Sequence, residues 1–141
     1  MSEIISSEST ILAVITILFT IWQNRIERAM NIEIDKPYAD LKTDHEFLLS
    51  VKKYSVLPLA MASVLNFLFL IPKALVILKT SFEILFSFPI TQVFQLYDLN
   101  SAILLFIDAS FLLLTILFFD MFIKMADINK KILIIKNKND N

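Results

Sequence analysis

Three long apolar segments dominate this chain of 141 residues. They cover roughly residues 9–29, 54–78 and 101–123. Each approaches or exceeds the ~20 residues that an α-helix needs to cross a hydrocarbon core of ~30 Å. Of all residues, 57% are hydrophobic, so three buried helices of a soluble bundle would leave too little polar surface for solubility. The sequence therefore predicts an all-α integral membrane bundle with three transmembrane helices.

The first apolar segment carries a stripe of small and polar residues, spaced alternately four and three positions apart. This seven-residue period places them on one face of a helix. The other positions are mostly large and apolar, which is the reverse of a water-soluble helix. A membrane helix of this kind turns its polar face to other helices or to water in a pore. The stripe consists of Ser2, Ser6, Ser9, Ala13, Thr16, Thr20, Gln23 and Glu27.

Two interpretations of this stripe are open. Small residues let membrane helices approach closely, which requires no water. Alternatively, the stripe lines the central pore of a homo-oligomer, since three spans make a poor channel in a single chain. Its continuation towards the cytoplasm favours the pore, and Glu8 could join a charged ring at the outer mouth. The residues expected to line the pore are Ser9, Ala13, Thr16, Thr20, Gln23 and Glu27.

The distribution of Lys and Arg predicts the orientation of the spans. The loop 24–53 carries six of them and the tail after Met121 carries five, whereas the N-terminal flank and the loop 80–100 carry none. Because Lys and Arg concentrate in cytoplasmic loops, we expect the N-terminus outside and the C-terminus inside. A four-span alternative, with residues 82–97 crossing as well, would put the N-terminus inside or the basic tail outside.

The connection between the first two spans is expected to be helical at both ends. The first helix keeps its pattern beyond the membrane and should end before Pro37, because the residue before a proline avoids helical geometry. It would then run about 30 residues, or ~45 Å, and project into the cytoplasm. Thr43 and Glu46 have capping-box spacing, so the second helix is expected to begin near Asp44. Residues 30–53 thus form a cytoplasmic helical turn.

Residues 80–100 follow the second span and are apolar and aromatic. They are short for a span and are broken by Pro89. We expect them to lie in the outer interface as one or two short helices, or to form a re-entrant element at a pore mouth. Asp98 or Asn100 can cap the third span.

The predicted transmembrane domain covers residues 1–123, and a basic cytoplasmic tail, residues 124–141, follows it. Within the tail, the apolar residues 132–135 are too few to span a membrane. They could dock on the helix ends or pair as a strand between subunits. Residues 137–141 are expected to be disordered.

Several polar residues lie inside the predicted spans. Asp108 is ~10 Å and Lys73 ~9 Å below the outer surface, counted by helical rise. A charge at such depth costs on the order of 2–3 kcal/mol, so we expect an intramembrane ion pair between them. The alternative is a Lys73 that extends to the interface, with Asp108 facing a wet cavity. Asn66 and Thr115 form a second layer, and Asp120 lies within reach of basic residues at the inner boundary.

Nothing in the sequence predicts catalysis, a metal or a cofactor. There is no Cys, and there is no Gly for a phosphate-binding loop. The single histidine, His45, is flanked by Asp44 and Glu46, and consecutive residues on a helix point in different directions. This is the pattern of a solvated helix start, so we expect a protein that is not an enzyme.

The architecture resembles the small membrane effectors of bacterial antiphage systems. The resemblance is carried by IWQNRIERAM after the first span and KKILIIKNKN in the tail. In the Hailong type, an oligonucleotide made by a nucleotidyltransferase controls a tetrameric membrane channel. The membrane subunit of the Kiwa type is a second candidate, although it is described with four spans. The resemblance implies the bacterial inner membrane, a tetramer and an oligonucleotide bound by the tail. The tail residues concerned are Lys130, Lys131, Lys136 and Lys138.

Two classes of function therefore follow from the sequence. The first is a homo-oligomeric channel or membrane-depolarising effector. The second is a non-conducting adaptor or regulatory subunit, which binds a partner through the cytoplasmic loop and tail. The bilayer, other copies of the chain and a short nucleic acid or nucleotide are the expected partners.

Overall fold

The computed structural model describes residues 2–89 and 98–139. Apart from short connections, this part of the chain is helical: α1 (Ser2–Met30), α2 (Tyr38–Val51), a π-helical turn (Lys52–Val56), α3 (Leu57–Ser87) and α5 (Leu99–Asn139). Three continuous helices are long and apolar enough to cross a membrane, namely Ser2–Met30, Asp40–Ser87 and Leu99–Lys138. The predicted all-helical fold with three helices able to cross a membrane is confirmed. Its orientation in the membrane and the number of copies stay predictions.

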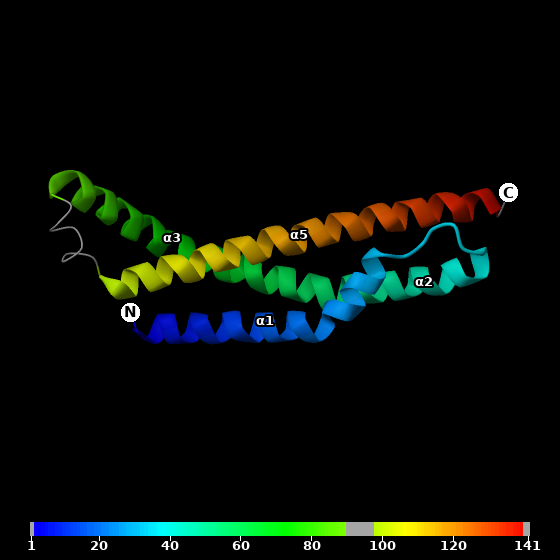
Figure 1. Ribbon diagram of the computed structural model, residues 1–141, viewed down its shortest axis with the longest axis horizontal. Coiled ribbons are helices and arrows are strands. Elements are labelled where there is room, and N and C mark those ends of the chain that lie inside the picture. Colours follow the sequence, from blue (N-terminus) through cyan, green and yellow to red (C-terminus); the bar gives the residue numbers. More distant parts are fainter. Residues whose placement is uncertain (1, 90–97, 140–141) are drawn as a thin grey trace.

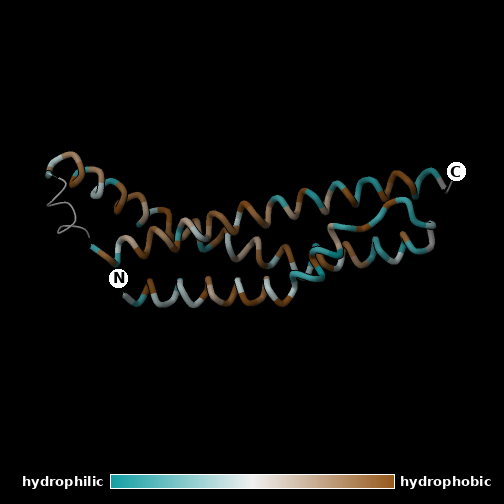
Figure 2. The backbone as a smooth tube through the Cα atoms, in the orientation of Figure 1, coloured by the Kyte–Doolittle hydropathy of each residue, from teal (hydrophilic) through white to brown (hydrophobic). Residues whose placement is uncertain are grey.

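The helices form an elongated bundle (Figure 1). α1 and α5 run in the same direction, and α3 runs against them and crosses α5. The starts of α1 and α5 and the end of α3 lie towards one end of the molecule, whereas α2 and the last turns of α5 form the other. Apolar residues dominate the first part, which we call the apolar region, and polar residues gather in the second, the hydrophilic end (Figure 2). The three candidate spans therefore lie side by side in the apolar region.

The core of the apolar region is aromatic and aliphatic. Phe111, Phe118, Leu70 and Leu104 are completely buried. The ring of Phe19 on α1 meets that of Phe118 on α5 edge to face, with 5.6 Å between the centroids. Aromatic pairs of this geometry contribute about 0.5–1.5 kcal/mol beyond their buried area. This contact also fixes the register of α1 along α5.

The expected start of the second helix near Asp44 is wrong. α1 ends at Met30, and α2 already begins at Tyr38 with Pro37 in the N-cap position. The N–H of Leu41 donates to the Pro37 carbonyl at 3.1 Å. Proline suits this place because its own N–H is not needed there and its φ is fixed. Thr43, the supposed cap, lies inside the helix.

A π-helical turn, Lys52–Val56, joins α2 to α3 without a break in the helix. There the N–H of Leu57 donates to the Lys52 carbonyl, five residues earlier. Pro58 follows directly, and a proline clashes with the carbonyl four residues before it. The wider turn accommodates this clash, as such bulges do elsewhere. The predicted span 54–78 is consequently the middle part of a longer helix.

The region expected in the outer interface is partly a continuation of that helix. α3 extends to Ser87, and the N–H of Phe88 still donates to the Ile84 carbonyl at 3.1 Å. Residues 90–97, the rest of this predicted segment, lie outside the described residues. The re-entrant alternative therefore stays a prediction.

The basic tail is not a separate segment, because α5 continues through it to Asn139. The possibility that residues 132–135 pair as a strand is wrong, and so is the expected disorder of residues 137–139. Ile132 is buried and Ile135 partly buried against the core that includes Leu41 and Met125. The tail therefore docks on the other helices, which was the other alternative.

Candidate functional site

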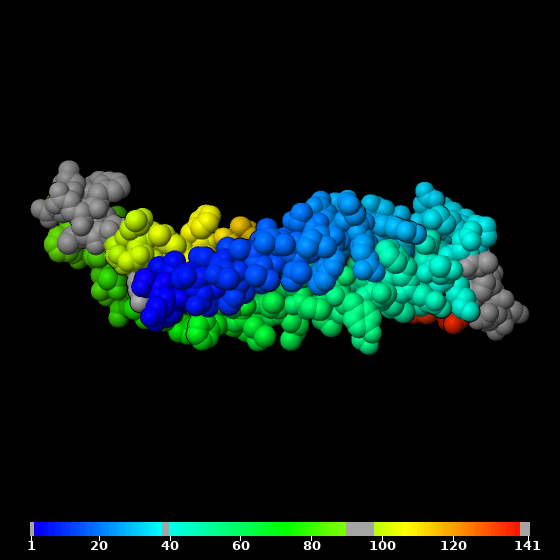
Figure 3. Space-filling model, turned by 90° about the horizontal axis from the view of Figure 1, so that it is seen from below, coloured from blue at the N-terminus to red at the C-terminus, as the bar shows by residue number. Residues whose placement is uncertain are grey.

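The polar stripe of α1 faces away from the rest of the chain. Ser9, Ala13, Thr16, Thr20, Gln23 and Glu27 are all exposed. The opposite side of the helix buries Ile15, Ile26 and Ala29. Figure 3 shows α1 on the outside of the bundle beside α3, uncovered along its length. The predicted stripe is thus available to a second copy, to lipid or to water.

The stripe has apolar neighbours and satisfied hydroxyl donors. Ile17 is 58% and Ile21 63% exposed beside it. The Thr16 hydroxyl donates to the Leu12 carbonyl at 2.8 Å, and that of Thr20 donates to the Thr16 carbonyl at 2.9 Å. Such bonds occupy the hydroxyl proton and leave the oxygen lone pairs free to accept. These threonines are therefore compatible both with an apolar neighbour and with water.

On the side of α1 away from the stripe, an apolar groove of about 260 Å³ runs between α1 and α3. Val14 stands at its edge and is exposed. The walls are almost entirely hydrocarbon, so the groove suits an aliphatic or aromatic side chain. Its main contributors are Val14, Leu18 and Trp22 of α1 and Pro58, Leu59 and Ala62 of α3.

Glu8 does not belong to an exposed ring beside the stripe. Its side chain is 5% exposed and lies on the inner face of α1. It precedes Ile15 by seven and Phe19 by eleven residues, which are spacings of one helical face. Sequence reasoning placed it at the pore mouth because it adjoins the first stripe residues. The apolar spacing is the signal that could have identified it as an inward residue.

The structure does not bring Lys73 and Asp108 together. Among the ion pairs of residues 2–89 and 98–139, none joins these two side chains. Lys73 lies on an exposed flank of α3, beside the buried Leu70 and Ala74. Asp108 is only 9% exposed. The long stem of a lysine lets its ammonium group reach an interface from such a flank, which was the alternative to the ion pair.

The other predicted polar layers are also not formed as cross-helix contacts. The Asn66 amide donates to the Ala62 carbonyl of its own helix at 2.7 Å. Asp120 pairs with Lys124 one turn along α5, at 2.7 Å. Thr115 keeps its hydroxyl oxygen buried, and it has no hydrogen-bond partner in the described part of the chain. Asn66 and Asp120 thus have partners on their own helices in place of the distant ones that the sequence suggested.

The hydrophilic end is held together by specific contacts between helices. A ring nitrogen of His45 on α2 lies 2.6 Å from the amide oxygen of Asn129 on α5. The guanidinium of Arg28 stands 4.9 Å above the Phe47 ring. The ammonium of Lys52 lies 4.0 Å from the centre of the Phe122 ring. The histidine thus joins α2 to α5 from inside α2, so the expectation of a solvated helix start at His45 is wrong.

The predicted polyanion-binding lysines are exposed but do not form one patch. Lys130, Lys131, Lys136 and Lys138 all project from the last turns of α5. Lys131 and Lys138 are seven residues apart and share a face, whereas Lys136 lies on another side of the helix. Lys131 also pairs with Asp127 at 2.7 Å. A bound polyanion would thus meet two lysines on one face of a single chain.

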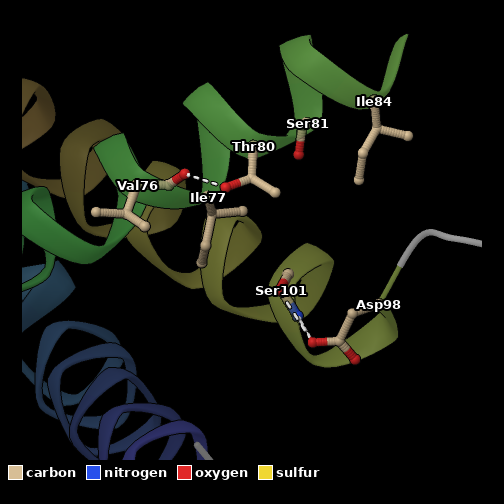
Figure 4. Close-up of a pocket in the computed structure, with 7 residues that line it drawn as sticks. All are labelled: Val76, Ile77, Thr80, Ser81, Ile84, Asp98 and Ser101. Atoms are coloured by element: carbon tan, nitrogen blue, oxygen red, sulfur yellow. Dashed lines mark hydrogen bonds between the residues drawn. The ribbon is translucent and has the colours of Figure 1, made fainter. Parts of the chain in front are cut away.

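At the opposite end of the molecule, a small pocket lies between α3 and α5 (Figure 4). It has a volume of about 150 Å³ and is bordered by Thr80, Asp98 and Ser101, among others. The Asp98 carboxylate accepts the Ser101 N–H at 3.3 Å and the Ser101 hydroxyl at 3.0 Å. Asp98 is therefore the cap of α5, as one of the two predicted alternatives proposed. The Asp98 carboxylate of this pocket thus serves the start of α5.

Comparisons with protein-family models, curated proteins and solved structures found no significant match to this chain. Over residues 2–89 and 98–139, no group of three or more acidic, histidine or cysteine side chains could hold a metal ion. Two features of the apolar region bear on the function. These are the outward stripe of α1 and the polar groups buried beneath it.

Proposed function

We propose that the protein is a homo-oligomeric membrane channel, or membrane-depolarising effector, whose pore is lined by α1. The observation that carries this proposal is the outward orientation of the six-residue stripe from Ser9 to Glu27. A helix surrounded only by lipid gains nothing from a regular polar face. Several copies that turn this face towards a common axis would enclose it, as expected of a closed rotational assembly.

Apolar side chains beside the stripe support this assembly. Large side chains such as Ile17 and Ile21 border the stripe and are exposed in a single chain. In the proposed oligomer they seal the contacts between adjacent copies, while the hydroxyls of Thr16 and Thr20 face the axis. Hydroxyl oxygens replace part of the hydration of a permeating species.

The proposal extends to an effector of the bacterial inner membrane in antiphage defence. In that setting the assembly is a tetramer, and an oligonucleotide or nucleotide binds at the tail lysines. The exposure of these lysines on a helix continuous with the third span supports this extension. A ligand there would act directly on a helix of the membrane region.

Cysteine scanning tests the pore, because the chain has no native cysteine. Thr16→Cys and Thr20→Cys should react with a membrane-impermeant methanethiosulfonate in liposomes. Ile17→Cys and Ile21→Cys are the matched controls, since these residues are also exposed in the single chain but adjoin the stripe. They should stay unreactive, because lipid or a neighbouring copy would cover them. Equal reactivity of both sets, or reactivity of neither, would contradict the pore.

The alternative, a non-conducting adaptor, is favoured by the hydrophilic end. α2 and the last turns of α5 form a docked helical layer, with Leu41, Leu48 and Met125 completely buried. Such a rigid layer presents a large surface to a partner protein. Expression in cells with a potential-sensitive dye separates the two functions. A channel or effector dissipates the membrane potential, whereas an adaptor leaves it unchanged.

A further inference from the structure

Three ionisable side chains lie beside or within the long apolar stretches of the three candidate spans, one on each helix. They are Glu8 on α1, Lys73 on α3 and Asp108 on α5. The stretches 9–24, 55–72, 74–78, 99–107 and 109–119 carry no Asp, Glu, Lys, Arg, His or Tyr. Charged groups in apolar membrane segments are costly and mark functional sites more often than structural ones. Their common position along the bundle is therefore informative.

One ring contact and one shared pocket indicate that the three residues lie at one level. Phe19 touches Phe118, and Glu8 and Ile107 each precede these rings by eleven residues. Because α1 and α5 run in the same direction (Figure 1), Glu8 lies level with Ile107 and Asp108. The two carboxyls thus share one depth in the apolar region.

The third residue reaches the same level from the other direction. Thr80 and Ser101 border one pocket (Figure 4), and Asp108 lies seven residues from Ser101. Lys73 lies seven residues from Thr80 on the antiparallel α3, which returns it to the depth of Asp108. Counted from Ser2 and Ser101, this level is ~10 Å along the helix axes.

The two carboxyls are buried without partners. Glu8 is 5% and Asp108 9% exposed. Within the described residues, Oε2 of Glu8 and Oδ1 of Asp108 are sealed from the surface and make no hydrogen bond. Lys73, the only cation at this level in the described part of the chain, is exposed and forms an ion pair with neither. An uncompensated carboxylate in such a place costs several kcal/mol, and this cost disappears when it binds a proton.

We propose that Glu8 and Asp108 form a proton-binding site inside the membrane region. Each carboxyl carries a proton when α1 is packed on α5. Loss of these protons places two like charges at one level between apolar helices, so water must enter and the contact of α1 with α5 weakens. The site is a consequence of burial and register, and it does not require that the protein conduct. It therefore stands or fails independently of the proposed channel.

Dicyclohexylcarbodiimide tests the site, because this apolar reagent adds to protonated carboxyls in apolar surroundings. The full-length protein in liposomes is treated over a range of pH and its peptides are analysed by mass spectrometry. We expect adducts on Glu8 and Asp108, whose yield declines about tenfold per pH unit once the carboxyls ionise. Asp98 and Asp120, which are exposed, are internal controls and should stay unmodified at neutral pH.

The outcomes separate the proposal from its alternatives. Absence of adducts at every pH, or equal modification of Asp120, would overturn it. Protection by sodium chloride but not by choline chloride would identify a sodium ion as the ligand, and would overturn the proton assignment. Glu8→Gln and Asp108→Asn should each remove one adduct and leave the other. The wild-type pH profile decides the question even if either variant does not assemble.

Discussion

The polar groups on the two faces of α1 differ in their hydrogen bonding. On the outward face, the hydroxyls of Thr16 and Thr20 donate to carbonyls of their own helix. On the inward face, Glu8 is buried with an oxygen that has no partner in the described structure. Exposed polarity is thus satisfied locally, whereas buried polarity is not. A polar stripe can therefore tolerate lipid, and the buried carboxyl is the group that needs a ligand.

The largest effect is expected from the packing of the inward face. Phe118→Ala removes the ring that meets Phe19 and leaves a cavity between α1 and α5. We expect a loss of about 3–5 kcal/mol in the free energy of unfolding. Phe119→Ala is the matched control, since the next ring along α5 is 64% exposed. Unfolding in detergent measures both, and similar losses would show that the two faces of α5 do not differ as described.

At Asp108, a substitution should not lower the free energy of unfolding. Asp108→Leu removes a buried oxygen without a partner, so it should leave stability unchanged or raise it by about 1–3 kcal/mol. The predicted ion pair with Lys73 gives the opposite result, because Asp108→Leu would then strand a charge. In that case Lys73→Met in the same chain should restore part of the loss. Unfolding of the single and double variants decides between the two, and additive losses reject the pair.

A substitution on the outward face of α1 should lower ion conduction. Thr20→Leu puts an apolar side chain on the stripe and opposes wetting, so ion flux into liposomes should fall about tenfold. Assembly should persist, because Thr20 is exposed and its hydroxyl donates to a carbonyl of its own helix. Leu18→Ala, off the stripe, should change stability more than flux. Unchanged flux in Thr20→Leu would remove the outward face from the pore.

The smallest effect is expected from single lysines of the tail. Lys131→Gln should weaken binding of a short DNA or RNA to the solubilised protein a few-fold, and lower the salt slope by about 0.7 per lost phosphate contact. Lys136→Gln is the informative comparison because it lies on another side of the helix. Equal and small effects would fit the attraction of any polybasic segment to anionic lipid, about 1 kcal/mol per charge. No measurable binding would leave only this lipid role.

Periodicity and length predicted the helical class, the three spans and the stripe, because these depend on local pattern alone. Counting residues from the span ends also placed Lys73 and Asp108 at one depth. The pocket shared by Thr80 and Ser101 fits this prediction, because Lys73 and Asp108 each lie seven residues from one of them. Counting residues does not reveal which side of each helix meets a neighbour. The position of Lys73 on an exposed flank could therefore not be predicted. Glu8 was expected at the pore mouth but lies on the inner face of α1. It sits at the margin of an apolar segment, next to the first residues of the stripe, so its immediate neighbours did not reveal its side.

The start of α2 and the length of α5 also differed from the sequence prediction. The Thr43–Glu46 spacing is a genuine capping pattern, but Pro37 offered an earlier start with a fixed φ. The length of α5 was missed because the lysines of the tail suggested a solvated segment. Ile132 and Ile135, spaced for one helical face, were the available signal, and they pack on the core.

α5 has a mechanical consequence that follows from its composition. Its 41 residues include neither proline nor glycine, so it runs as one stiff rod of about 60 Å through the apolar region and beyond. A tilt of about 5° would displace its far end by ~5 Å, which is one helical turn. α3, by contrast, carries Pro72 and follows a widened turn, and can bend instead of tilting. Force applied at the lysine end would therefore travel to Asp108 through the rod, with no joint in between to absorb it.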